Sequence, residues 1–121
     1  MTKTILAALL TCTLAAPALA EGYPVQGRWG ESKTSENGPV DCAKLRVIAF
    51  NGDQRTDTGG GVPAYRNLSV APDSGGYKIT DIFTTGQIRN GRVNYVLRKM
   101  DADRIELRQQ VGGTIKLQRC K

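Results

Sequence analysis

The sequence predicts a small all-β domain: an antiparallel up-and-down barrel of about seven to eight strands, with one disulfide bond. Short runs rich in Val, Ile, Leu and Tyr lie between clusters of Gly, Asn, Asp and Pro, and no long segment has helical periodicity. So many short runs in a small chain favour a closed barrel, because closure removes exposed strand edges. A two-sheet β-sandwich is the alternative.

The first twenty residues have the zones of a secretory signal peptide. Lys3 gives a positive start, residues 5–16 are mostly apolar, and Ala18-Leu19-Ala20 forms the small-x-small site that signal peptidase cleaves. The apolar stretch is too short for a transmembrane helix, which takes about 20 residues. We therefore expect residues 1–20 to be removed and the protein to be periplasmic or secreted from a bacterium.

Cleavage leaves residues 21–121, which are enough for one domain and too few for two. Cys12 would be discarded with the signal, since its surroundings fit a lipid-anchor site poorly. Cys42 and Cys120 remain, and an even cysteine count in an exported protein predicts a disulfide. By the chain-entropy model, a bond that closes so long a loop contributes about 4 kcal/mol.

The first four runs are separated by turn and loop signals. They are residues 25–32, 43–50, 63–70 and 77–85. Polar residues 33–41 and residues 53–61, which end in three glycines, are expected as loops. Asn51-Gly52 after the second run is typical of a tight turn.

The last three runs alternate apolar and polar side chains. They are residues 92–100, 104–110 and 114–120. Val93, Tyr95 and Leu97 would face inward, with the alternate apolar residues of the next two runs. The opposite face of such an antiparallel sheet can lie in water.

Positive charge is concentrated in this last third of the chain. Residues 86–121 hold nine Lys or Arg and three Asp or Glu, whereas residues 21–85 hold seven and eight. A meander of the last three strands would gather cations on one outer surface: Arg92, Arg98, Arg104, Arg108 and Lys116. That surface would attract anionic partners by long-range steering, or it would be a solvated face with no partner.

Gly27-Arg28-Trp29 opens the first expected strand, and Arg119 lies in the last. This pairing resembles the lipocalin-like (calycin) barrels, whose first strand carries Gly-x-Trp and whose last strand supplies an arginine that covers the indole. The resemblance implies that Trp29 and Arg119 close one end of the barrel, where a guanidinium can stack on the aromatic face.

Exported bacterial metalloprotease inhibitors are a more distant resemblance, in size, signal peptide, Gly-x-Trp strand and single disulfide. Those inhibitors insert an N-terminal segment into the protease, whereas only residues 21–26 precede Gly27 here. Their disulfide also closes a small loop near the N-terminus. An inhibitor of a secreted hydrolase would use residues 33–41 and 53–61 as its contacting loops.

The side chains of the common catalytic systems are missing. The chain has no histidine, which excludes Ser-His and Cys-His nucleophiles and histidine-based metal sites. Asp101 and Asp103 bracket an expected turn, where Asp is favoured for turn hydrogen bonds. The few aromatic residues are expected in the core rather than on a base-stacking surface. We therefore expect no enzyme activity, no metal, no cofactor and no nucleic-acid partner.

Three functions fit these observations. The first, which we favour, is an exported non-catalytic binding module, a lipocalin-like barrel that holds a small apolar or amphipathic ligand. The residues expected to face that ligand are Ile48, Phe50, Tyr77, Phe83 and Tyr95. The second is an envelope protein whose basic face binds an anionic partner, and the third is an inhibitor of a secreted hydrolase.

Overall fold

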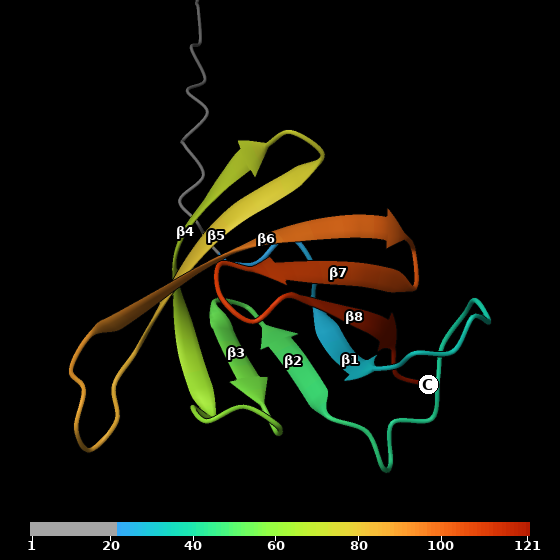
Figure 1. Ribbon diagram of the computed structural model, residues 1–121, viewed down its shortest axis with the longest axis horizontal. Coiled ribbons are helices and arrows are strands. Elements are labelled where there is room, and N and C mark those ends of the chain that lie inside the picture. The colour runs from blue at the N-terminus through green and yellow to red at the C-terminus, as the bar shows by residue number, and fades with distance from the viewer. Residues whose placement is uncertain (1–21) are drawn as a thin grey trace, which may run out of the picture.

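The computed structural model describes residues 22–121, which form one closed antiparallel barrel (Figure 1). The strands are β1 (Gly27–Glu31), β2 (Val47–Asn51), β3 (Gln54–Asp57), β4 (Ala64–Asp73), β5 (Gly76–Phe83), β6 (Gly91–Asp101), β7 (Arg104–Gln109) and β8 (Thr114–Arg119). They follow one another around the barrel in sequence order, and β8 pairs with β1 to close it. The predicted fold class is therefore confirmed as a closed barrel of eight strands.

The expected signal peptide, its cleavage site after Ala20 and Cys12 lie outside the described residues. Residues 22–121 contain no helix, so none of them belongs to a helix that could cross a membrane.

One strand lies where the sequence predicted a loop. β3 falls within residues 53–61 and pairs with β2 on one side and β4 on the other. Its inward side chains, Arg55 and Asp57, are charged and buried, so β3 lacks the apolar alternation that marks the other strands. The loop prediction is wrong for Gln54–Asp57; residues 58–63 connect β3 to β4.

Large apolar side chains fill the middle of the barrel. Seven of them are at most 2 % exposed: Trp29, Ile48, Phe50, Ile79, Leu97, Ile105 and Leu117. They come from β1, β2 and β5 to β8 and belong to one cluster, and Val70 of β4 packs against that cluster from a partly buried position. Each such side chain stabilises the folded state by about 1.5–3 kcal/mol when it leaves water.

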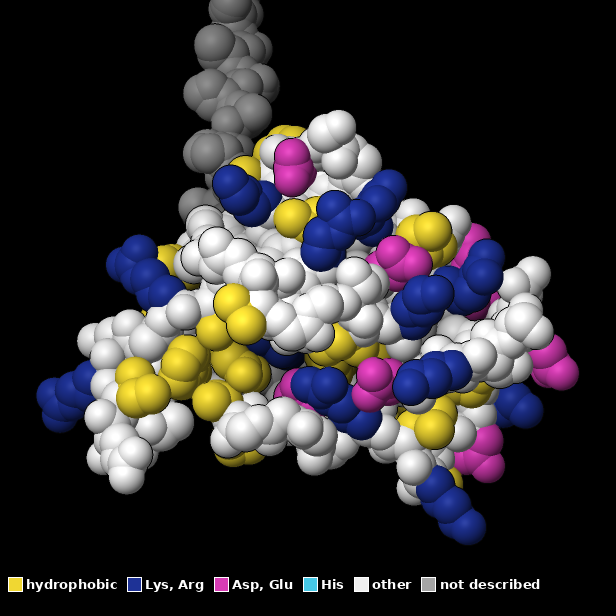
Figure 2. Space-filling view, viewed as in Figure 1, with side chains coloured by type: hydrophobic (Ala, Val, Ile, Leu, Met, Phe, Trp, Pro, Cys, Tyr) yellow, Lys and Arg dark blue, Asp and Glu magenta, His cyan; other side chains and the backbone are white. Residues whose placement is uncertain are grey.

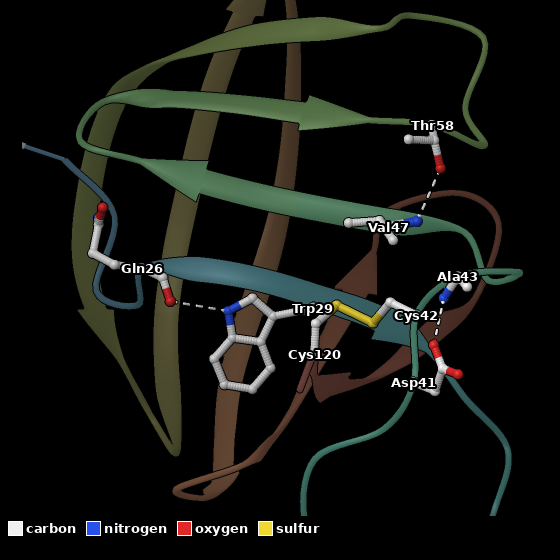
Figure 3. The surroundings of a disulfide bond; sticks show 8 residues. All are labelled: Gln26, Trp29, Asp41, Cys42, Ala43, Val47, Thr58 and Cys120. Carbon is white, nitrogen blue, oxygen red and sulfur yellow. Dashed lines mark hydrogen bonds between the residues drawn. A yellow bond between two sulfur atoms is a disulfide. The ribbon is translucent and has the colours of Figure 1, made fainter.

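One end of the barrel is sealed by the segment that precedes β1. The Tyr23 ring packs edge-on against Phe50, with ring centres 4.9 Å apart, and the Tyr23 amide donates a hydrogen bond to the Gly52 carbonyl. The Trp29 indole N–H donates to the Gln26 carbonyl at 3.2 Å (Figure 3). We call this end, with the β2–β3 and β6–β7 turns, the closed end.

Trp29 and Arg119 meet at the closed end. They are register partners on β1 and β8, and the guanidinium carbon of Arg119 lies 4.3 Å from the centre of the Trp29 ring. Arg119 also donates to the Ala102 carbonyl and pairs with Asp103. The structure thus places the arginine over the indole and ties both residues to the β6–β7 turn.

The disulfide joins Cys42, in the loop between β1 and β2, to Cys120 just after β8 (Figure 3). Its sulfur atoms lie outside the barrel against Gly30, where a β-carbon would come within 2.6 Å of the Cys42 Sγ. A parallel bridge between Val40 and Cys120 lies beside it. The bond therefore holds the β1–β2 loop against the seam where β8 meets β1, and it is compatible with an oxidising compartment.

Candidate functional site

A cavity of about 320 Å³ lies at the end opposite the closed end, which we call the mouth. Its lining comes from β3, the first residues of β4 and β6, the end of β7, the start of β8 and the adjoining loops. In Figure 2 hydrophobic side chains gather near the start of β6, and acidic and basic side chains lie next to one another over β1 and β2. The lining of the cavity includes apolar residues, among them Val93, Leu107 and Ile115, and charged residues, among them Arg46, Arg55 and Asp57.

Arg55 forms part of the inner boundary of this cavity. Its Nε donates a 2.8 Å hydrogen bond to the Asp81 carboxylate, and the two side chains are 7 % and 0 % exposed. Tyr95 donates its hydroxyl proton to the same Asp81 oxygen at 2.8 Å, and the Asn67 amide donates to the other oxygen at 3.2 Å. Asp81 thus accepts three hydrogen bonds, so its buried charge is compensated.

The terminal nitrogens of Arg55 are uncommitted. Within residues 22–121 the one side-chain hydrogen bond of the guanidinium is the Nε bond to Asp81, although the Tyr23 hydroxyl lies close enough to interact with Arg55. The terminal nitrogens are not fully enclosed, unlike the Tyr23 hydroxyl and Asn67 Oδ1. The guanidinium stacks on the Tyr65 ring at 3.8 Å and lies 5.0 Å from the centre of the Tyr95 ring. The two rings and Asp81 fix its orientation while its outer N–H groups remain available to the cavity.

A second ion pair stands at the rim. Arg46 donates from Nε and Nη2 to the two Asp57 oxygens at 2.9 and 2.7 Å, and its Nη1 lies 3.8 Å from Glu31. The Gly59 amide also donates to Asp57. Burial raises the pKa of Asp57, but the hydrogen bonds from Arg46 and Gly59 and the Arg46 charge outweigh burial, so its pKa lies below the ordinary value.

Two tyrosines near Asp81 remain protonated. Burial, with the negative charge of Asp81, raises the pKa of Tyr23 above its ordinary value, and the nearby Arg55 guanidinium opposes this rise. Burial also raises the pKa of Tyr95, even though the Arg55 charge opposes this. Both phenols therefore stay neutral at physiological pH, and Tyr95 acts as a hydrogen-bond donor rather than as a base.

The five residues expected to face a ligand separate into groups. Ile48 and Phe50 are buried in the core, and Tyr77 packs against that core from a partly buried position. Phe83 lies beside Tyr65, with ring centres 5.6 Å apart, and lines a shallow outer depression. Tyr95 is the one of the five that lines the mouth cavity.

The five cations expected on one surface do not form an unbroken patch. Glu106 lies in register between Arg98 and Lys116, and Arg104 pairs with Asp101 at 2.8 Å. Arg92 stands near the other end of β6 and lines the mouth cavity. Arg108 is exposed on β7. Figure 2 shows Asp and Glu side chains interspersed with Lys and Arg over β6 to β8.

Parts of the two expected contacting loops already make contacts within the barrel, since β3 lies within residues 53–61 and residues 36–38 bind β8. Residues 33–41 cross the outside of β8, where the Gln118 amide donates to the Glu36 and Gly38 carbonyls. An outer groove of about 640 Å³ runs between residues 31–35 and β7 and β8.

Asp101 and Asp103 stabilise the β6–β7 turn, since Asp101 accepts hydrogen bonds from the Asp103 amide and from Arg104. No group of three His, Cys, Asp or Glu gathers within residues 22–121.

Comparison of the chain with family models, curated proteins and solved structures finds no match.

Sequence reasoning missed the residues that give the mouth its charge. Arg46, Arg55, Asp57 and Asp81 were not singled out as a group, because the partners of each ion pair lie 11 or 26 positions apart in the chain. One signal was available. Arg55 and Asp57 alternate with Gln54 and Thr56, and they follow the Asn51-Gly52 turn directly. That spacing fits the second strand of a hairpin whose inward positions are charged.

Proposed function

We propose that this protein is an exported, non-catalytic binding module that holds a small amphipathic ligand in the mouth of its barrel. The observation that carries the proposal is the mouth cavity, whose volume of about 320 Å³ is within the range of small-molecule sites. It joins an apolar wall, formed by Val93, Leu107 and Ile115, to the polar groups of Arg55 and its neighbours. Convergent polar groups beside apolar surface are typical of ligand sites.

The packed core restricts the ligand to the mouth. Ile48, Ile79 and Leu97 are 0 % exposed, so the space beneath Arg55 and Tyr95 is already filled by side chains. A ligand that lies deep in the barrel, as the lipocalin-like hypothesis expected, would have to displace this core. The proposal therefore differs from that hypothesis in placing the ligand above Arg55.

The test is a titration followed by ¹⁵N–¹H NMR spectra of the mature protein. The titrants are three single-ring amphiphiles with different head groups: phenylacetate, 2-phenylethanol and 2-phenylethylamine. At least one is expected to shift the amide signals of Tyr65, Val93 and Tyr95 in a saturable way. The proposal is overturned if none of the three shifts the mouth signals, or if the shifts cluster elsewhere.

A matched pair of variants locates the site. Val93→Trp fills the cavity, whereas Val96→Trp adds the same bulk to the opposite face of β6. We expect Val93→Trp to weaken binding by about tenfold or more, the loss of about 1.4 kcal/mol, and Val96→Trp to leave it unchanged. Equal affinity in both variants would contradict a site in the mouth.

The basic outer face and the inhibitor loops are weaker candidates. Glu106 interrupts the cations, and the backbone of residues 36–38 is bonded to Gln118. Neither surface has a guanidinium held in place by a buried carboxylate, whereas the mouth has Arg55.

A further inference from the structure

We infer that the ligand is a short-chain or single-ring carboxylic acid whose carboxylate binds the terminal nitrogens of Arg55. This inference rests on the proposed function and adds the chemistry of the head group and the size of the tail. It joins three observations: an oriented guanidinium with free donors, the charges that line the cavity, and the filled core beneath it.

The first observation concerns Arg55 itself. A buried guanidinium gains stability from each N–H group that finds an acceptor, and Arg55 uses Nε alone within residues 22–121. Its two terminal nitrogens form a planar fork that matches the two oxygens of a carboxylate. Because Asp81 and the Tyr65 ring already hold the fork in place, an incoming acid does not have to order it.

The second observation is the charge of the lining. Three arginines and one aspartate line the cavity: Arg46, Arg55, Arg92 and Asp57. Asp57 is occupied by Arg46, and Asp81 lies behind Arg55 and accepts from it, whereas Arg92 takes part in no ion pair within residues 22–121. Electrostatics therefore favour a ligand with a single negative charge beside Arg55 and Arg92. A doubly charged phosphate would stand close to two carboxylates, which disfavours it relative to a monoanion.

The third observation sets the size of the tail. The cavity is at the lower end of the volumes of ligand sites, and its inner boundary is formed by Arg55 and Tyr95 above the packed core. The tail has Val93, Leu107 and Ile115 to contact and no space below them. A single ring or a few methylene groups fit this wall, whereas a long acyl chain would extend into water.

The test compares matched ligands by calorimetry and by the NMR titration. Phenylacetate is expected to bind about tenfold or more tightly than 2-phenylethanol, which keeps the ring and loses the charge. Phenyl phosphate is expected to bind more weakly than phenylacetate, and palmitate no more tightly. If the alcohol binds as tightly as the acid, the inference about the head group is wrong while the proposed function stands. If none of the ring compounds shifts the mouth signals, the proposed function itself is wrong.

The variants assign the effect to Arg55. Arg55→Gln/Asp81→Asn removes both buried charges together, so no charge is left without its partner. We expect the preference for phenylacetate over 2-phenylethanol to disappear in this variant and to persist in Arg108→Gln, which removes an exposed cation from β7. Arg55→Lys provides a second reading if the double variant does not fold, because it keeps the charge and loses the fork. An unchanged preference in Arg55→Lys and in the double variant would overturn the inference.

Discussion

Each end of the barrel has an arginine stacked on an aromatic ring, but which of the two side chains lies inside differs between the ends. At the closed end the ring is inside and the arginine outside: Trp29 is 1 % exposed, and the Arg119 side chain that covers it is 41 % exposed. At the mouth the arginine is inside and the ring outside, since Arg55 is buried and the half-buried Tyr65 covers it. The first order makes an apolar plug, and the second presents a cation to the mouth.

The difference shows how a small barrel can hold a buried charge. The closed end excludes water with large apolar contacts, which favour folding. The mouth places Arg55, Asp57 and Asp81 in the wall, where each needs a partner because an unpaired buried charge is costly. We therefore expect stability to depend mostly on the closed end and ligand binding mostly on the mouth.

The largest expected effect comes from removing the plug. Trp29→Ala should lower the free energy of unfolding by about 3–5 kcal/mol, because it deletes the largest buried side chain and leaves a hole. Tyr65→Ala, the matching change at the mouth, should cost about 1 kcal/mol, since its ring is half-buried and contacts only the Arg55 guanidinium and the edge of Phe83 among the aromatic and cationic side chains. Urea denaturation measures both. Similar losses in the two variants would refute the division of roles between the ends.

The next effect comes from the disulfide. Cys42→Ala/Cys120→Ala should lower the free energy of unfolding by about 2–4 kcal/mol, mainly because the unfolded chain regains freedom. Urea denaturation of the oxidised protein, the reduced protein and the variant measures this. The reduced protein and the variant should agree with each other. Stability equal to that of the oxidised protein in both would contradict a structural role for the bond.

The third effect lies at the rim and depends on pH. The pKa of Asp57 is below its ordinary value, so its charged form stabilises the folded state above the unfolded pKa of about 3.9. That contribution is lost as the pH falls through the lower pKa of the folded state. At neutral pH, Asp57→Asn should therefore be less stable than the natural protein by about 2 kcal/mol. Thermal unfolding across a pH series should show the gap closing below about pH 4; a gap that persists in acid would contradict the assignment.

The sequence predicted the fold best where one face is apolar. Residues 92–120 alternate cleanly, and β6, β7 and β8 lie within the expected runs to within a residue at each end. The two cysteines within residues 21–121 predicted the disulfide correctly. These features follow from local periodicity and from counting, and neither depends on the register of distant strands.

The mouth was harder to predict because its partners meet only when the barrel closes. Arg55 and Asp81 lie on β3 and β5, two strands apart, and no local pattern pairs them. The inward charged residues of β3 also kept this strand from being predicted, because they break the alternation of apolar and polar residues by which a strand is recognised. The first half of the run at 43–50 shows the reverse error: Ala43 and Leu45 are apolar but belong to the loop that carries Cys42.

The position of the disulfide determines what a single proteolytic cut can do to the chain. Cys42 and Cys120 join β2 to β8 into a covalent ring, and three of the loops at the mouth, residues 58–63, 84–90 and 110–113, lie within that ring. A single cut in any of them opens the ring without releasing a fragment. The two pieces remain attached through the sulfur atoms and through the strand pairs on either side of the cut. The loops that border the cavity can therefore be nicked once while the chain stays in one piece.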